Sequence, residues 1–103
     1  MNEFNLRKEL GTLKDPRRGQ AQQHKIDVVL MITIMATMSG YQGYRAIGDF
    51  GLRYKNEIVE YLKLPKDKVP AYATVRRVLM NINHQKYGDI FTKWMKHYET
   101  TAQ

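Results

Sequence analysis

Apolar residues recur along most of the chain with the spacing of amphipathic helices. Within residues 72–83, Val75, Val78, Leu79 and Ile82 stand at i, i+3, i+4 and i+7, which places them on one side of an α-helix. The same periodicity predicts further helices in four other segments: residues 4–13, 44–54, 55–64 and 85–99. The pattern therefore favours an all-helical chain.

The most apolar segment, residues 28–38, predicts a helix buried at the centre of the fold. It is apolar all round, and Asp27 suits the N-cap or first turn of a helix that runs to about Ser39. Its β-branched residues would also suit a buried strand, but the chain has no second run of this kind to pair with it. Its eleven residues fall short of the about 20 that span a bilayer. We expect an all-α fold, a compact bundle of five to six short helices that forms a single domain over residues 1–103.

Composition and charge narrow the choice of partner. A hydrophobic content of 43% is enough for one core, and 17 Lys+Arg against 10 Asp+Glu give a net charge of +7. This charge favours nucleic acid or a membrane surface, although many basic proteins bind neither. The chain has no cysteine, which excludes disulfides and thiolate chemistry, and its charged N-terminus does not match a signal peptide. A cytoplasmic location is expected.

If the apolar side of the helix over residues 72–83 docks on the core, its other side is polar and basic. That side carries no acidic residue and consists of Thr74, Arg76, Arg77, Met80, Asn81 and His84. Arginine can donate two hydrogen bonds to guanine and asparagine can pair with adenine, so these side chains suit a helix that reads the major groove of double-stranded DNA. A plain solvated surface helix has the same pattern.

Two other basic segments are candidate DNA contacts. Lys66 and Lys68 precede the helix and could hold phosphates, and the order of short helix, turn-rich loop and amphipathic helix makes the C-terminal half helix-turn-helix-like. Arg17 and Arg18 could form a flexible basic arm that lies along phosphates or enters a minor groove. The alternative for this arm is an ordinary solvated loop.

No pattern of residues indicates catalysis, a metal or a cofactor. The acidic residues lie on separate predicted helices or on solvated faces, and His24, His84 and His97 lack metal-ligand spacing. Aromatic residues near the C-terminus could stack on bases, but their helical spacing favours core packing. We expect no catalytic residue, no metal, no cofactor, no small-molecule substrate and no membrane contact.

Several short motifs occur in the order typical of one known family. They are Leu13 to Arg18, His24, the apolar helix ending at Ser39-Gly40, Ile47 to Gly51, Val69-Pro70, Thr74 and Arg77-Val78. Over residues 10–98 the chain resembles the DDE-transposase-associated N-terminal domain of insertion-sequence transposases of the H-repeat-associated type. The resemblance implies that the chain helps to recognise or organise the DNA of an insertion element.

The chain departs from the family pattern in two respects. Ala71 and Tyr72 stand where the family often has serine and histidine, so a side chain suited to cap the following helix is missing. The chain also ends at Gln103, before the DDE catalytic domain of such transposases would begin, and the metal-binding carboxylates of that domain have no counterpart. We expect this polypeptide alone not to cut or join DNA.

These observations lead to hypotheses of different classes. The first is a non-catalytic domain that binds double-stranded DNA through Arg76, Arg77, Asn81 and Thr74, assisted by Arg17, Arg18, Lys66 and Lys68. The second is a protein-interaction module that docks on a transposase catalytic domain or on its own copy as a homo-oligomer. A third, a decayed remnant of a mobile element, predicts a folded domain without DNA preference.

Overall fold

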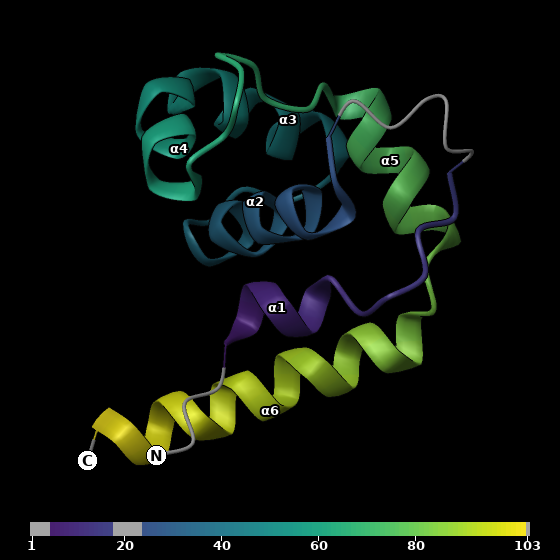
Figure 1. Cartoon of the computed structure of the whole chain (residues 1–103), viewed down its shortest axis with the longest axis vertical. Coiled ribbons are helices and arrows are strands. Elements are labelled where there is room, and N and C mark those ends of the chain that lie inside the picture. Colours follow the sequence, from purple (N-terminus) through teal and green to yellow (C-terminus); the bar gives the residue numbers. More distant parts are fainter. Residues whose placement is uncertain (1–4, 18–23, 103) are drawn as a thin grey trace.

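The computed structural model describes residues 5–17 and 24–102, and these residues form six α-helices and no strand (Figure 1). The helices are α1 (Leu6–Leu10), α2 (Ile26–Met38), α3 (Tyr44–Arg53), α4 (Lys55–Leu62), α5 (Tyr72–Asn81) and α6 (His84–Ala102). The predicted all-α class and the number of helices are confirmed. The last helix, with 19 residues, is longer than predicted.

α2 lies in the middle of the molecule, with α3 and α4 on one side and α1 and α6 on the other (Figure 1). Most of its side chains are buried, which confirms the predicted central helix and excludes the strand. The buried Thr33 is accommodated because its hydroxyl donates to the Val29 carbonyl oxygen at 2.8 Å, one helical turn earlier. Asp27 occupies the first turn, one of its two predicted positions.

Arg7 of α1 ties three helices together. Its Nε donates to Oδ2 of Asp27 at the start of α2, at 2.9 Å. Its Nη1 donates at 2.7 Å to the carbonyl oxygen of Leu62 at the end of α4, where carbonyl groups lack partners within the helix. Asn5 is the N-cap of α1, and its side chain accepts a hydrogen bond from the Lys8 N–H at 3.1 Å. Arg7 therefore holds the start of α2 and the end of α4 close to α1.

Gly48 allows α3 and α5 to make the most extensive helix–helix contact among the described residues. A Cβ atom at Gly48 would lie 2.8 Å from Cβ, 2.9 Å from N and 3.0 Å from Cα of Tyr72, closer than carbon atoms pack. One turn later, Gly51 faces Val69, with 3.5 Å left for a Cβ atom. Gly48 lets the first turn of α5 lie against α3, whereas a Cβ atom at Gly51 would make an ordinary van der Waals contact with Val69 in the preceding loop.

α5 ends two residues earlier than the sequence predicts, because Ile82 has an extended backbone with φ −75° and ψ 165°. Asn83 directly precedes α6, and its side-chain oxygen accepts a hydrogen bond from the Lys86 N–H at 3.0 Å. His84 therefore belongs to α6, and its predicted place on the polar side of α5 is wrong. α5 packs on α3 and α2, and the helix-turn-helix-like arrangement stays a prediction.

Replacing Gly48 by alanine should lower the free energy of unfolding by about 1–3 kcal/mol, the usual cost of overpacking. The added methyl group meets backbone atoms of Tyr72, which cannot rotate away as a side chain can. Gly88→Ala in α6 is the matched control, because no atom lies within 4 Å of a Cβ atom there and alanine favours a helix by about 1 kcal/mol. Urea denaturation measures both, and equal stability of the two variants would contradict the contact.

Candidate nucleic-acid interface

α5 turns its valines inward and its arginines outward. Val75 and Val78 are 1% and 0% exposed, whereas Arg76 and Arg77 are exposed. Among the described residues, neither guanidinium group has an ion pair or a hydrogen bond, and α5 contains no acidic residue. Both arginines are therefore available to an anion.

The exposed side of α5 has two edges. Successive residues are about 100° apart around a helix axis, so Arg77 shares one edge with Thr74 and Asn81 while Arg76 lies on the other. Nδ2 of Asn81 donates to the Arg77 carbonyl oxygen at 2.8 Å, which uses one of its two N–H donors. The side-chain oxygen and the second N–H of Asn81 have no hydrogen bond to any described residue.

The edge that carries Arg76 is continuous with a second arginine from α3. Tyr72 lies one turn before Arg76, and the guanidinium of Arg45 lies over the Tyr72 ring, 4.6 Å from its centroid. This cation–π contact adds to the packing of α5 on α3. Positive charge therefore extends from α5 onto its neighbour along this edge.

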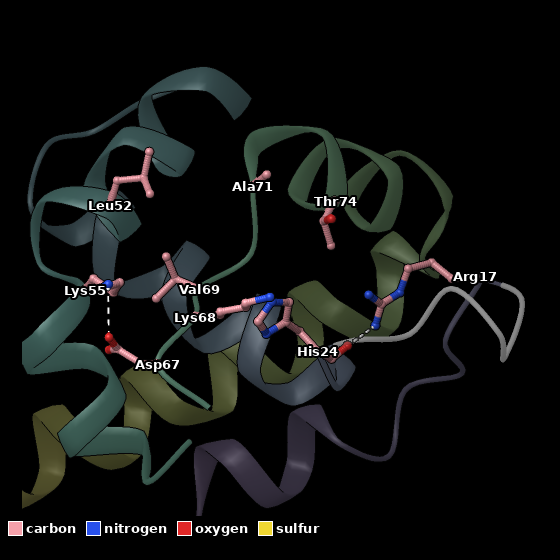
Figure 2. A pocket seen from close by; sticks show the side chains of 9 residues that line it. All are labelled: Arg17, His24, Leu52, Lys55, Asp67, Lys68, Val69, Ala71 and Thr74. Carbon is pink, nitrogen blue, oxygen red and sulfur yellow. Dashed lines mark hydrogen bonds and ion pairs between the residues drawn. The ribbon is translucent and has the colours of Figure 1, made fainter. Parts of the chain in front are cut away.

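A hollow of about 610 Å³ lies beside the first turn of α5, and we call it the Thr74 hollow (Figure 2). It is lined by Arg17, His24, Leu52, Lys55, Asp67, Lys68, Val69, Ala71 and Thr74. Figure 2 shows Thr74 pointing into it from α5, and Lys68 and His24 directed towards each other. Asp67, the carboxylate among its described lining residues, is paired with Lys55 at 3.2 Å.

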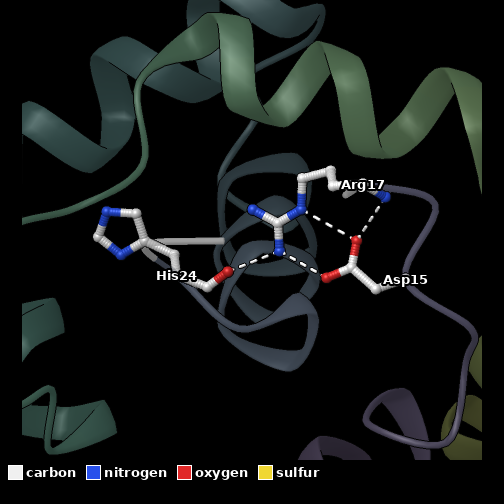
Figure 3. A network of polar contacts seen from close by, with 3 residues as sticks. All are labelled: Asp15, Arg17 and His24. Atoms are coloured by element: carbon white, nitrogen blue, oxygen red, sulfur yellow. Dashed lines mark hydrogen bonds and ion pairs between the residues drawn. The ribbon is translucent and has the colours of Figure 1, made fainter. Parts of the chain in front are cut away.

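Arg17 does not belong to a solvent-exposed arm. Its side chain is 1% exposed, with Nε 3.0 Å from Asp15 Oδ1 and Nη2 2.7 Å from Asp15 Oδ2 (Figure 3). Nη2 also donates to the His24 carbonyl oxygen at 2.6 Å. The predicted role of Arg17 as an exposed DNA contact is wrong, because a bidentate carboxylate neutralises its charge inside the fold. Arg18 lies outside the described residues.

The Asp15–Arg17 pair is intact at neutral pH. Burial raises the pKa of Asp15, but the hydrogen bonds and positive charge of Arg17 outweigh this effect and leave the pKa below its ordinary value of 3.8. Because Arg17 also binds the His24 carbonyl, the pair fixes the backbone that enters α2. Arg17 is therefore a structural clamp.

The surroundings of His24 favour the neutral form of its imidazole. Burial lowers the pKa of His24 from its ordinary 6.5, and the positive charges of Arg17 and Lys68 lower it further. A bound anion would oppose these two charges and favour protonation of the imidazole. His24 is thus placed to respond to an anion in the neighbouring hollows.

A second hollow, which we call the lysine hollow, has a volume of about 490 Å³ and shares His24 and Lys68 with the first. The described residues that line it are Arg7, His24, Lys25, Val28, Lys63, Leu64, Pro65, Lys66 and Lys68, and none of these is acidic. The predicted contacts Lys66 and Lys68 thus come together here. His24, Lys25 and Lys63 also line this hollow, and segments distant in sequence bring them to one place. Lys25 was expected near the Arg17–Arg18 contact, whereas His24 and Lys63 were not predicted as contacts.

The described residues contain neither a candidate metal site nor a membrane-spanning helix. In the part of the chain that the structure describes, no group of three histidine, aspartate or glutamate side chains is placed to hold a metal ion. Among the helices of the same residues, none has the length and apolar character needed to cross a bilayer.

The fold and the surface define a small helical domain whose basic side chains gather around α5 and the two hollows. The chain matches the family described as DDE_Tnp_1-associated over residues 7–95, and it belongs to this family. The resemblance predicted from the motifs is thereby confirmed. No solved structure matches the chain.

Several curated relatives come from Escherichia coli (strain K12). The chain is similar to the "H repeat-associated putative transposase YbfD", with 28% identity over 96 residues, 93% of this chain and 38% of the relative. YhhI, which has the same description, is 29% identical over 91 residues, 88% of this chain and 24% of YhhI. The "Inactive transposase YbfQ" is 28% identical over 74 residues, 72% of this chain and 87% of YbfQ. The chain thus spans less than half of YbfD and YhhI and most of YbfQ.

Replacing Arg17 by glutamine should lower the free energy of unfolding by about 3–5 kcal/mol, because Asp15 then keeps a largely buried charge without its partner. Lys14→Gln removes the same charge at an exposed position next to Asp15 and should leave the free energy of unfolding nearly unchanged. Urea denaturation of both variants measures the difference. A stability of Arg17→Gln equal to that of Lys14→Gln would contradict the clamp.

The free energy of unfolding should fall as the pH drops through 6.5, the ordinary pKa of His24. Because the pKa is lower in the folded chain, the unfolded chain takes up the proton first, and stability is complete only above this pH. Denaturation at about pH 5.5 and about pH 7.5 tests this, and His24→Gln should reduce the difference. His84→Gln, at an exposed position, should retain it. An unaltered pH dependence of stability in His24→Gln would show that His24 is not its cause.

Proposed function

We propose that this chain is a non-catalytic domain that binds double-stranded DNA and helps to recognise or organise the DNA of an insertion element. The observation that carries the proposal is the exposed side of α5, where Arg76 and Arg77 face solvent without a carboxylate partner among the described residues. Lys66 and Lys68 lie in the loop before α5, where they would contact phosphates.

The make-up of α5 supports an approach to the major groove. An α-helix fits this groove, and the arginines at the two edges can bind guanine bases or the flanking phosphates. Between these edges lie Ala73 and Met80, both exposed and apolar, which suit contact with a thymine methyl group. Thr74 and Asn81 add a hydroxyl and an amide along the Arg77 edge.

Membership of the family supports the same proposal, since relatives of this chain carry transposase names and transposition acts on DNA. Within the proposal, residues 1–103 recognise DNA in the cytoplasm and perform no catalytic step. Arg18 remains a proposed phosphate contact, whereas the buried Arg17 is no longer proposed as one.

A second candidate function is protein interaction, favoured by exposed apolar side chains away from the lysine hollow. Met38, Leu52 and Tyr61 are 59%, 67% and 70% exposed. Exposed apolar side chains of this size suit docking on a transposase catalytic domain or on a second copy of the chain. Size-exclusion chromatography with light scattering distinguishes this candidate, because self-association without DNA preference would favour it. Absence of both properties would favour the decayed remnant.

Replacing Arg76 and Arg77 together by glutamine should weaken DNA binding by about 1–3 kcal/mol for each bidentate base contact that is lost. The measurement is a fluorescence anisotropy titration with a duplex that carries the terminal repeats of the insertion element, and with a scrambled duplex. The double variant should also lose preference between the two duplexes. Lys86→Gln with Lys93→Gln is the control, because it removes two exposed charges from α6.

The comparison of these two double variants decides the role of α5. If the Arg76 and Arg77 variant binds as tightly and as selectively as the control, α5 is not the helix that contacts bases. If the unaltered chain binds neither duplex, the DNA-binding proposal itself is rejected.

A further inference from the structure

We propose that the lysine hollow holds the phosphodiester backbone of the DNA that α5 engages, through Lys25, Lys63, Lys66 and Lys68. The inference rests on the proposed DNA binding and adds a second, sequence-independent contact to it. Lys63 enters the interface only through the folded structure, which also brings Lys25 next to Lys66 and Lys68.

The lysine hollow has an excess of positive charge that no ion pair with a described residue neutralises. Among the described residues that line it none is acidic, and Arg7 at its wall is already bonded to Asp27 and to the Leu62 carbonyl. Its four lysines have no ion pair with any described residue, and all four are exposed. Such a concentration of like charge in one hollow is unfavourable without an anion, and an anion would relieve it.

Lys63 has a backbone conformation that is usually found at glycine. It ends α4 in the left-handed conformation, with φ 55° and ψ 52°, and the Leu64 N–H donates to the Val59 carbonyl oxygen at 3.0 Å. This helix ending usually carries glycine, because a Cβ atom is strained there. A lysine at this place adds a cation to the wall of the hollow despite the strain.

The lysine hollow is connected to α5 through shared residues. His24 and Lys68 line both hollows, and Thr74 of α5 lines the other one. Thr74, Arg77 and Asn81 follow one another along one edge of α5, at i, i+3 and i+7. A basic track therefore runs from that edge of α5, past Lys68, to Lys25 at the start of α2.

The side chains of the hollow suit phosphates rather than bases. A lysine ammonium is a compact charge without the planar fork of arginine, so it attracts phosphate oxygens without reading a sequence. DNA carries a charge for about every 1.7 Å of its axis, which matches a continuous track of cations better than a single bound ion. DNA is favoured over an anionic membrane because the track continues from the base-contacting edge of α5.

The test replaces three of the lysines, as Lys25→Gln, Lys63→Gly and Lys66→Gln in one chain. Glycine is chosen at residue 63 because its left-handed conformation suits glycine, so removal of the charge should not unfold α4. The control is Lys8→Gln, Lys86→Gln and Lys93→Gln, which removes the same charge from exposed lysines outside both hollows. Circular dichroism confirms that each variant is folded, and Lys63→Gly with Lys66→Gln replaces the triple variant if it is not.

The readout is the affinity for the terminal-repeat duplex and for its scrambled version at several salt concentrations. The hollow variant should reduce the slope of log K against log salt by about 2–3, since each lost phosphate contact contributes about 0.9. Its affinity for both duplexes should fall by the same factor, with the ratio between them unchanged. The Arg76 and Arg77 variant, in contrast, should change that ratio.

The outcomes separate this inference from the proposed function. If the unaltered chain binds DNA and the hollow variant keeps the slope of the control, the inference is wrong and the α5 proposal stands. If the unaltered chain binds neither duplex, both are wrong. Loss of binding to phosphatidylserine vesicles in the hollow variant, with DNA binding intact, would assign the hollow to a membrane and overturn the inference.

Discussion

The close approach of α3 and α5 at Gly48 determines how α5 lies on the fold and which of its side chains are exposed. The backbone of Tyr72 leaves no room for a Cβ atom at Gly48, so the first turn of α5 has a fixed place. Once that turn is fixed, the burial of Val75 and Val78 determines which side of α5 is exposed. The outward direction of the α5 arginines is therefore a consequence of core packing.

The cations of the chain divide into two groups with different roles. Arg7 and Arg17 are bonded to carboxylates and to backbone carbonyl oxygens, and they hold the helices and the entry to α2 in place. Arg76, Arg77 and the lysines of the hollow have no such partners among the described residues. Arginine suits the first role because its fork can bind two acceptors at once. The cations of the second group, on α5 and in the lysine hollow, are available to an external polyanion.

The helices and the polar side of α5 were predictable because both follow from apolar periodicity. The end of α5 was not, since Ile82 breaks the helix without a glycine or proline, and Asn83 was the only local signal of a new start. The burial of Arg17 had a local signal in Asp15, two residues earlier, but a basic run with this sequence is equally typical of a solvated loop. The lysine hollow was not predictable, because Lys25 and segment 63–68 meet only in the folded chain.

DNA binding through α5 and the lysine hollow is tested most directly by titrating the ¹⁵N-labelled chain with a short DNA duplex and following the backbone amide chemical shifts. Such binding should give saturable shifts at Thr74 and Arg77, in the loop at residues 66–68 and at Lys25, with little change along the middle of α6. Saturable shifts confined to the surroundings of Met38 and Tyr61, which line neither hollow, or the absence of any saturable shift, would contradict DNA binding at this site.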